Sequence, residues 1–271
     1  MDRVATRDQE TSANEVIHGS PVAHTCQVMN VTPLNGSTYE IELESSGDAV
    51  LNYRAGQYLK LKLDLNWSGQ PHSVFYTIAN GFDPEQPRRL QLFIQNGSNF
   101  ANSIINHLSE LNDSGQEIQA TLAMGRAYLQ TDLQLPHLFI ASGSGISKIK
   151  CLTEEILRQN PDAKVNIYWS NKDIEDFYLL GQFQGWADKH RNINFTTILE
   201  SGDKDHSGRS GYIYQVIEED FDRLDGVQTY LCGSPRMVYG TIDKLKSRGL
   251  DEENCYSDVF EFAPRDQRKA V

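Results

Sequence analysis

The stretch Leu138-Phe139-Ile140-Ala141-Ser142-Gly143-Ser144-Gly145 decides the fold of the second half of this chain. Its four apolar residues predict a short buried strand over residues 138–141, and the periodicity that follows predicts a helix from about 146 to 158. Only serine and glycine separate the two, so a ligand could approach the backbone, and the helix N-terminus would offer free N–H groups to a phosphate. The full dinucleotide-binding pattern needs a third glycine where Lys148 stands. These residues alone are therefore equally compatible with an ordinary strand-to-helix turn that binds no ligand.

Strands and helices continue to alternate on the C-terminal side of this turn. The pattern predicts strands over residues 165–169, 195–199 and 229–232, helices near 177–189, 214–219 and 235–248, and a closing element over 259–262. Such alternation is typical of a parallel sheet with crossover helices. Cys232-Gly233-Ser234-Pro235 repeats the small-residue turn after a later strand. Because the carboxyl ends of parallel strands meet at one edge, the two turns predict a single ligand crevice.

The N-terminal half has a different rhythm, with short strands separated by turns. Leucines at positions 59, 61, 63 and 65 alternate with polar residues, which predicts a strand with one wet face over 58–65; residues 38–43 and 90–94 are similar. Apolar residues at positions 100, 104, 108 and 111 predict one helix after the Gly97-Ser98-Asn99 turn. These patterns predict an antiparallel barrel or sandwich. We expect a leader over 1–22, an antiparallel domain over 23–132 and a parallel α/β domain over 133–271.

Composition excludes several functional classes. The chain has 271 residues with 25 Lys plus Arg and 37 Asp plus Glu, and its net charge of −12 argues against a nucleic-acid partner. No apolar run approaches the roughly 20 residues of a membrane span. The first 20 residues lack the apolar core of a signal peptide, so we expect a cytoplasmic protein. The four cysteines and seven histidines show no metal-ligand spacing, so no metal site is expected.

Taken together, six segments resemble the ferredoxin–NADP reductase superfamily, and most closely its NAD(P)H:flavin oxidoreductase branch, over about residues 24–263. The segments that carry the resemblance are Arg54-Ala55-Gly56-Gln57-Tyr58, Ser142-Gly143-Ser144-Gly145, Ile167-Tyr168-Trp169, Gly208-Arg209-Ser210-Gly211, Cys232-Gly233 with Met237, and Asp258-Val259-Phe260. The resemblance implies two domains: an antiparallel flavin-binding β-barrel followed by a parallel-sheet α/β domain that binds the nicotinamide cofactor.

The resemblance also implies an activity, the transfer of a hydride from nicotinamide C4 to flavin N5. The cofactors would be NADH or NADPH and a flavin, riboflavin, FMN or FAD. Thr77 matches the hydroxyl position near flavin N5, and Cys232 matches a position beside the nicotinamide, so these two are the candidate catalytic residues. The candidate cofactor-binding residues are Phe75, Tyr76, Thr77, Gly97, Ser98, Gly143, Ser144, Gly145, Lys172, Arg209, Gly233 and Ser234. Lys172, assisted by Arg209, would meet the 2′-phosphate of NADPH.

One departure from the family pattern keeps the alternatives open. Val74 stands where the family usually has an arginine that reaches the flavin phosphate or ribityl chain. Loss of a charge-assisted hydrogen bond of about 1.5 to 3 kcal/mol predicts a loosely bound flavin, or a flavin that is itself a substrate. Two other functions remain: a reductase component with bound flavin that passes electrons to a separate oxygenase or iron–sulfur protein, and a catalytically degenerate binding or regulatory protein.

Overall fold

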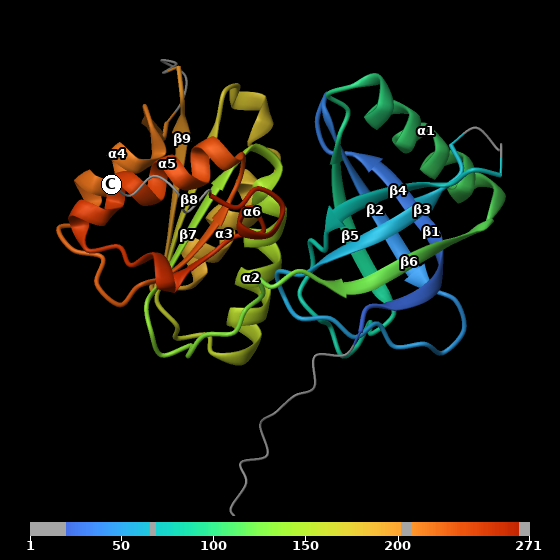
Figure 1. The fold of residues 1–271 in the computed structure, drawn as a ribbon, viewed down its shortest axis with the longest axis horizontal. Helices are drawn as coiled ribbons and strands as arrows, with labels where there is room; N and C mark the ends of the chain where they lie inside the picture. The colour runs from blue at the N-terminus through green and yellow to red at the C-terminus, as the bar shows by residue number, and fades with distance from the viewer. Residues whose placement is uncertain (1–19, 66–68, 202–206, 266–271) are drawn as a thin grey trace, which may run out of the picture.

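Two six-stranded sheets lie side by side in the computed structural model, which describes residues 20–65, 69–201 and 207–265 (Figure 1). The predicted leader over 1–22 falls almost entirely outside the described residues. Within the described part, no helix is long and apolar enough to cross a membrane. No group of metal-ligating side chains was found among the same residues.

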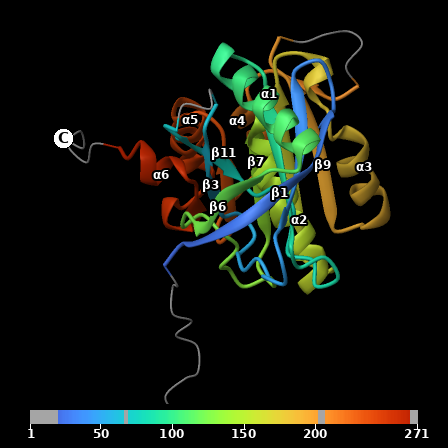
Figure 2. The ribbon, with the colours of Figure 1, turned by 90° about the vertical axis from the view of Figure 1, so that its right-hand side faces the viewer.

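The first sheet is antiparallel and curves into an open barrel. Its strands are β1 (Val22–Pro33), β2 (Thr38–Ser45), β3 (Tyr58–Leu63), β4 (His72–Thr77), β5 (Arg89–Gln95) and β6 (Glu117–Met124), in the order β4-β3-β6-β1-β2-β5. Figure 2 looks onto the barrel and shows β3, β6 and β1 side by side. The predicted alternation is confirmed, because the three leucines of β3 are fully buried in the barrel core. The edge strands β4 and β5 approach each other where the Ala79 N–H donates to the Gln91 carbonyl over 2.7 Å.

A single helix, α1 (Asn99–Ser114), packs onto the barrel core, as its apolar spacing predicts. The hydroxyl of Ser98 caps its N-terminus by accepting from the Ala101 N–H over 3.1 Å. Gly115 ends it in the left-handed conformation that glycine adopts most easily.

The second sheet is parallel, with strands β7 (His137–Ser142), β8 (Val165–Asn171), β9 (Ile193–Leu199), β10 (Arg209–Ser210), β11 (Gln228–Cys232) and β12 (Cys255–Tyr256) in the order β10-β9-β8-β7-β11-β12. Its helices are α2 (Ile146–Gln159), α3 (Leu180–Lys189), α4 (Ile213–Asp220), α5 (Pro235–Leu245) and α6 (Val259–Phe262). Successive residues of β7 face opposite cores: Phe139 packs with α2 and α3, and Leu138 packs with α4 and α5. Helices therefore cover both faces, as the alternating pattern predicts.

Three details differ from the expectations. The closing element over 259–262 is the short helix α6, and the sheet ends instead on the two-residue strand β12. Helix α3 begins at Leu180, because Phe177 lies in a turn where its ring packs edge-on against Trp169 at 5.1 Å. The strand expected over 58–65 ends at Leu63.

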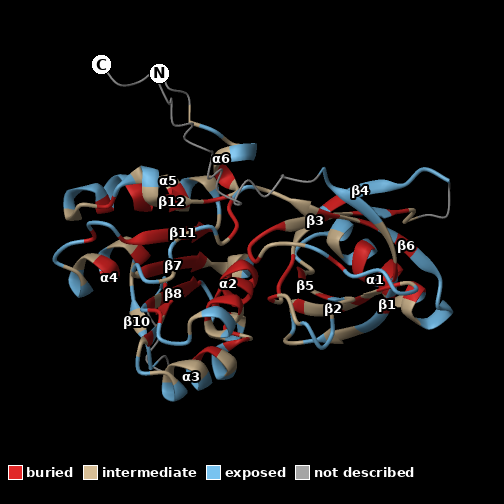
Figure 3. Ribbon diagram, turned by 90° about the horizontal axis from the view of Figure 1, so that it is seen from below, coloured by how far each residue is buried: buried red, intermediate tan, exposed pale blue. Residues whose placement is uncertain are grey.

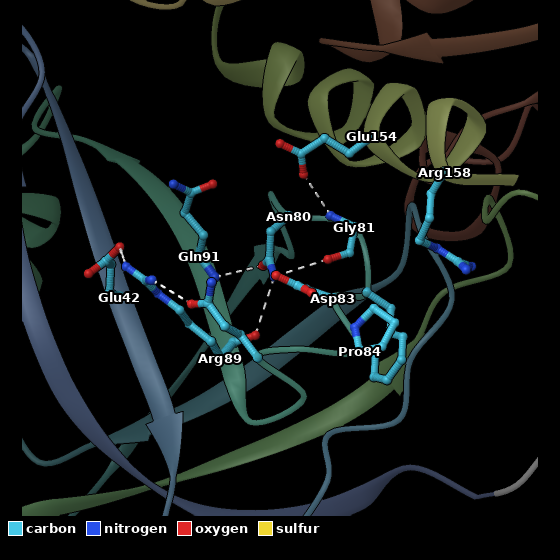
Figure 4. A pocket seen from close by; sticks show the side chains of 11 residues that line it. Glu42, Asn80, Gly81, Asp83, Pro84, Arg89, Gln91, Glu154 and Arg158 are labelled. Atoms are coloured by element: carbon cyan, nitrogen blue, oxygen red, sulfur yellow. Dashed lines mark hydrogen bonds and ion pairs between the residues drawn. The ribbon is translucent and has the colours of Figure 1, made fainter. Parts of the chain in front are cut away.

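Helix α2 holds the two sheets together, and Figure 3 shows it between them in the colour of buried residues. The Lys150 ammonium, which is almost fully buried, donates to the barrel carbonyl of Ala79 at 3.2 Å and to Gln91 Oε1 at 2.6 Å. It also pairs with Glu154 at 2.7 Å. Figure 4 shows the Glu154 carboxylate accepting from the Gly81 N–H, over 2.8 Å. These contacts fix the barrel against the first helix of the second domain.

The segment from Arg54 to Tyr58 meets the interdomain connection, and glycine is needed at its centre. Gly56 has a φ of +97°, and a Cβ built on it would lie 2.7 Å from the Ala127 carbonyl oxygen. Its N–H donates to Cys151 Sγ of α2 over 3.4 Å. An added methyl group would therefore strain the backbone and push the connection away.

We expect Gly56→Ala to lower the free energy of unfolding by about 2 kcal/mol or more, because it combines positive-φ strain with a backbone clash. Urea unfolding followed by circular dichroism measures the change. Gly36→Ala is the matched control: a Cβ there meets nothing within 4 Å, so its effect should stay within about 0.5 kcal/mol. Equal stability of the two variants would contradict the close approach at Gly56.

Candidate functional site

A cleft of about 620 Å³ opens at the carboxyl edge of the parallel sheet, against the ends of β4 and β5. Thr77 and Gln95 line it from the barrel. The two small-residue turns line it from the parallel sheet, after β7 and after β11. The structure thus brings both predicted turns to one crevice and adds a wall from the other domain.

The first turn is held open by backbone geometry. Gly143 has a φ of +55°, and residues Gly143–Gly145 form one 3-10 turn before α2 begins. The Trp169 indole N–H donates to the Gly143 carbonyl over 2.9 Å, and the Ser147 hydroxyl donates to the Ser144 carbonyl over 2.8 Å. No side chain of the described residues caps the N-terminus of α2. The Ile146 N–H at its start donates to the Gly143 and Ser144 carbonyls. A ligand in the cleft would therefore meet chiefly the positive end of the α2 dipole.

The second turn packs directly against the first, and this close packing requires glycine at positions 145 and 233. A Cβ on Gly145 would collide with the Cys232 carbonyl, and a Cβ on Gly233 would collide with the Ser142 hydroxyl and Met237. Ser234 then caps α5 by accepting from the Met237 N–H over 3.3 Å. Two helices therefore begin at the same edge of the cleft, an arrangement that favours a bound pyrophosphate.

Cys232 lies at the cleft with its thiol neutral. Burial raises its pKa to about 12, with a smaller raising effect from Asp258 and a lowering effect from Lys148. A thiol that stays protonated is a poor nucleophile. Cys232 is therefore suited to pack against a ring as a small polarizable side chain rather than to form a covalent bond.

An ion pair that sequence reasoning missed lines the same cleft. The Lys148 ammonium lies 2.7 Å from Asp258 Oδ2 and donates to the Ala127 carbonyl over 3.2 Å. In the sequence, Lys148 stands out only as the residue that breaks the glycine pattern. Both residues stand in segments that carry the family resemblance or adjoin them, but nothing in the sequence pairs one with the other.

The barrel residues predicted to meet the flavin divide between two faces of β4. Thr77 lines the cleft, and Phe75, which is 55% exposed, lies on the same outer face with its ring edge-on to Tyr58 at 6.1 Å. Tyr76 and Val74 alternate with them and pack against the barrel core, opposite Leu59 and Leu61 of β3. Phe75 and Tyr76 are not among the residues that line the cleft. An arginine at position 74 would have to leave the barrel interior to meet a phosphate.

Gly97 and Ser98 lie at the start of α1, outside the lining of the cleft. The ring of Phe100 in the first turn of α1 meets the His72 ring at the start of β4, with centroids 5.8 Å apart. The predicted flavin segments of β4 and α1 are therefore neighbours, although they come from separate stretches of sequence.

The two predicted cations have different surroundings. Lys172 is exposed, lines the cleft near Asp173 and Glu200, and makes no ion pair with the described residues. The Arg209 guanidinium pairs with Glu219 and, at 2.9 Å, with Asp220, and it does not line the cleft. Of the two, only Lys172 is placed to meet a ligand in the cleft.

The cleft fits a nicotinamide dinucleotide, because open space lies in front of Gly143 and two helix N-termini converge there. The model for the oxidoreductase NAD-binding domain family matches residues 139–242. A probable flavin reductase of Vibrio harveyi is 26% identical over 241 residues, which cover 88% of this chain and 99% of that protein. Residues 139–242 therefore match an oxidoreductase NAD-binding domain, and the chain as a whole is similar to a flavin reductase.

Two further comparisons extend this similarity. The CDP-6-deoxy-L-threo-D-glycero-4-hexulose-3-dehydrase reductase of Yersinia pestis is 28% identical over 261 residues, or 94% of this chain and 75% of that protein. The flavohem-like FAD/NAD binding domain of nitric oxide dioxygenase from Vibrio cholerae shares the fold, with a TM-score of 0.74 and 16% identity over 86% of this chain and 97% of that one. The two-domain fold expected from the resemblance is confirmed.

Burial raises the pKa of the Cys26, Cys151, Cys232 and Cys255 thiols to about 12 each, so thiolate forms only in strongly alkaline solution. We expect the native protein to resist iodoacetamide at about pH 8, where an ordinary thiol reacts. All four cysteines should react after unfolding in urea. Peptide mapping by mass spectrometry gives the modified fraction at each position. Modification of Cys232 in the native state at the rate seen in urea would contradict its burial.

Proposed function

We propose that this chain is a member of the ferredoxin–NADP reductase superfamily and acts as an NAD(P)H-dependent flavin reductase, in which the flavin is loosely bound or is itself a substrate. The observation that carries the proposal is one cleft lined by Thr77 of the barrel and by Cys232 of the parallel sheet. The names of relatives support it, since they include flavin reductases and reductase components.

Reduced nicotinamide would supply a hydride from C4, and the flavin would accept it at N5. The chain's own part is to hold both rings and exclude water. The positive dipole ends of α2 and α5 attract the pyrophosphate, and the interlocked glycine turns keep the approach open. The neutral Cys232 thiol packs beside the nicotinamide, and the Thr77 hydroxyl donates a hydrogen bond near flavin N5. Contact between the domains through α2 holds these groups in one arrangement, which lowers the entropic barrier to transfer.

Loose flavin binding is supported by the barrel. Val74 is 7% exposed in the barrel core, so it offers nothing to a phosphate. The described residues also lack a cysteine cluster for an iron–sulfur centre. As an alternative, the chain would serve as a reductase component that passes electrons to a separate oxygenase or iron–sulfur protein. The net charge of −12 disfavours nucleic acid as a partner, and we place the protein in the cytoplasm, where reduced nicotinamide is available.

The first test is the visible spectrum of the purified protein, followed by oxidation of NADH and NADPH with riboflavin, FMN or FAD added separately. We expect a colourless protein that oxidises reduced nicotinamide only when a flavin is present. A tightly bound yellow flavin would instead favour the reductase component. Binding of nicotinamide without turnover of any flavin would contradict the proposal and favour a degenerate binding protein.

The nicotinamide preference depends on Lys172 and Glu200, which line the cleft with opposite charges. We expect Lys172→Ala to raise the KM for NADPH and Glu200→Gln to lower it, each up to about fivefold because exposed charge pairs contribute at most about 1 kcal/mol. The KM for NADH should change little. Steady-state kinetics with both cofactors measures the split, and the exposed Lys164, which precedes β8 at the opposite end of the strand, provides the control Lys164→Ala. An identical KM for NADPH in all variants would show that Lys172 is an ordinary solvated surface residue.

A further inference from the structure

A further contact between the two domains lies beside the cleft, and the proposed hydride transfer leaves it without a role. The turn between β1 and β2, residues 34–37, meets the short 3-10 helix Ile174–Asp176, which follows β8. Leu34 of this turn packs against the core of the parallel-sheet domain. The segment after β8 carries Lys172 and Asp176, and both line the cleft. One wall of the cleft is therefore in contact with the barrel.

The side chain of Asn35 gives this contact a direction. Its Oδ1 accepts from the Ser37 N–H over 3.0 Å and from the Thr38 N–H over 2.7 Å. Because these two donors fix the oxygen end of the amide, Nδ2 is left to donate, and it donates to the Glu175 carbonyl over 2.8 Å. The Ser37 hydroxyl donates to Asp176 Oδ1 over 3.2 Å. Asn35, Ser37, Glu175 and Asp176 together form an interdomain clasp.

The 3-10 helix in this segment is weakly bonded within itself. The Asp176 N–H donates to the Asp173 carbonyl over 3.2 Å, and the Phe177 N–H donates to the Ile174 carbonyl over 3.3 Å. Both bonds are longer than the usual N–H to oxygen distance of about 2.9 Å. A single 3-10 turn with such bonds depends on tertiary contacts for its position. The clasp supplies such contacts from the barrel.

Ring contacts connect the same segment to the glycine turn of the cleft. Tyr178, which follows the 3-10 helix, meets Phe93 of β5 edge-on at 5.6 Å and Trp169 of β8 at 5.5 Å. The Trp169 indole N–H donates in turn to the Gly143 carbonyl. A shift of the segment away from the barrel would therefore disturb the Gly143 turn as well.

We propose that Asn35 and Ser37 of the barrel are positioning residues for the nicotinamide cofactor, because they hold residues 172–176 in the place where these form a wall of the cleft. The inference rests on the proposed function, since it assigns a role at the same nicotinamide site. Neither residue lines the cleft, so both act through the segment after β8 and do not touch the cofactor. Without the clasp, the segment occupies its binding-competent position for a smaller fraction of the time, and the affinity for the cofactor falls in proportion.

The test measures the Kd for NADH by isothermal titration calorimetry without flavin, so that no turnover occurs. Asn35→Asp keeps an acceptor for the two N–H groups of the turn, as aspartate does in such turns, but has no donor for the Glu175 carbonyl. We expect its Kd to be about three- to tenfold higher than that of the wild-type protein, as the loss of one hydrogen bond predicts. Ser37→Ala keeps the backbone N–H and loses only the hydroxyl, and its Kd should rise about two- to fivefold.

Two controls separate positioning from charge and from general stability. Gly36→Asp adds the same charge to the same turn and leaves both clasp side chains in place, since a Cβ there meets nothing within 4 Å. Its Kd for NADH should stay within about twofold of the wild-type value, because exposed charges interact weakly. The Kd for riboflavin and the midpoint of thermal unfolding should not change in any variant, whereas a merely structural role would move both.

The outcomes separate this inference from the proposed function. Wild-type affinity for NADH in both Asn35→Asp and Ser37→Ala would overturn the positioning role and leave the reductase proposal intact. Equal weakening in Asn35→Asp and Gly36→Asp, with no effect of Ser37→Ala, would assign the change to charge and overturn the inference too. If Asn35→Asp does not fold, the neutral Ser37→Ala decides alone. Absence of NADH binding by the wild-type protein would contradict the proposed function and this inference with it.

Discussion

Two lysines on one buried helix determine how the halves of this protein meet. Lys150 donates to Ala79 and Gln91 of the barrel, and Lys148 donates to Ala127 in the connection and pairs with Asp258 near the C-terminus. A buried ammonium is unfavourable unless hydrogen bonds and a counter-charge replace its water. Each lysine has both, and loss of either partner would leave a buried charge uncompensated.

This constraint explains why the cleft has two walls of different origin. The N-terminus of α2 follows the Gly143–Gly145 turn at the cleft, and its later turns hold the barrel through Lys150 and Glu154. The same helix therefore presents the positive end of its dipole to a ligand and holds the barrel so that Thr77 and Cys232 line one cleft. A flavin reductase needs such an arrangement, because both rings must meet while water is excluded.

The regular parts of the fold could be predicted from the sequence because each depends on local periodicity. The strand expected over 138–141 is β7, and the helix expected from 146 to 158 is α2, with boundaries that differ by a residue or two at most. The type of the closing element over 259–262 could not be predicted, because the four residues of α6 are too few to show a helical or strand periodicity of apolar residues. The two-residue strands β10 and β12 carry no pattern of their own and depend on their neighbours in the sheet.

The site was predictable only in part, for a related reason. The turns at Gly143 and Gly233 carry local signals, and they line the cleft as the resemblance implies. Which face of a strand a residue occupies depends on register, and this places Tyr76 against the barrel core and Phe75 outside it. The Lys148 pair with Asp258 joins residues far apart in the chain, and no local pattern records such a contact.

Direct transfer between the two rings is the central claim, and a kinetic isotope effect tests it most directly. Deuterium is placed in turn on each of the two faces of C4 of the reduced nicotinamide, and rapid-mixing absorbance follows flavin reduction. If the cleft holds the nicotinamide in one orientation against the flavin, deuterium on one face slows reduction and deuterium on the other has almost no effect. Equal slowing by deuterium on either face would contradict transfer from a nicotinamide held in one orientation in this cleft.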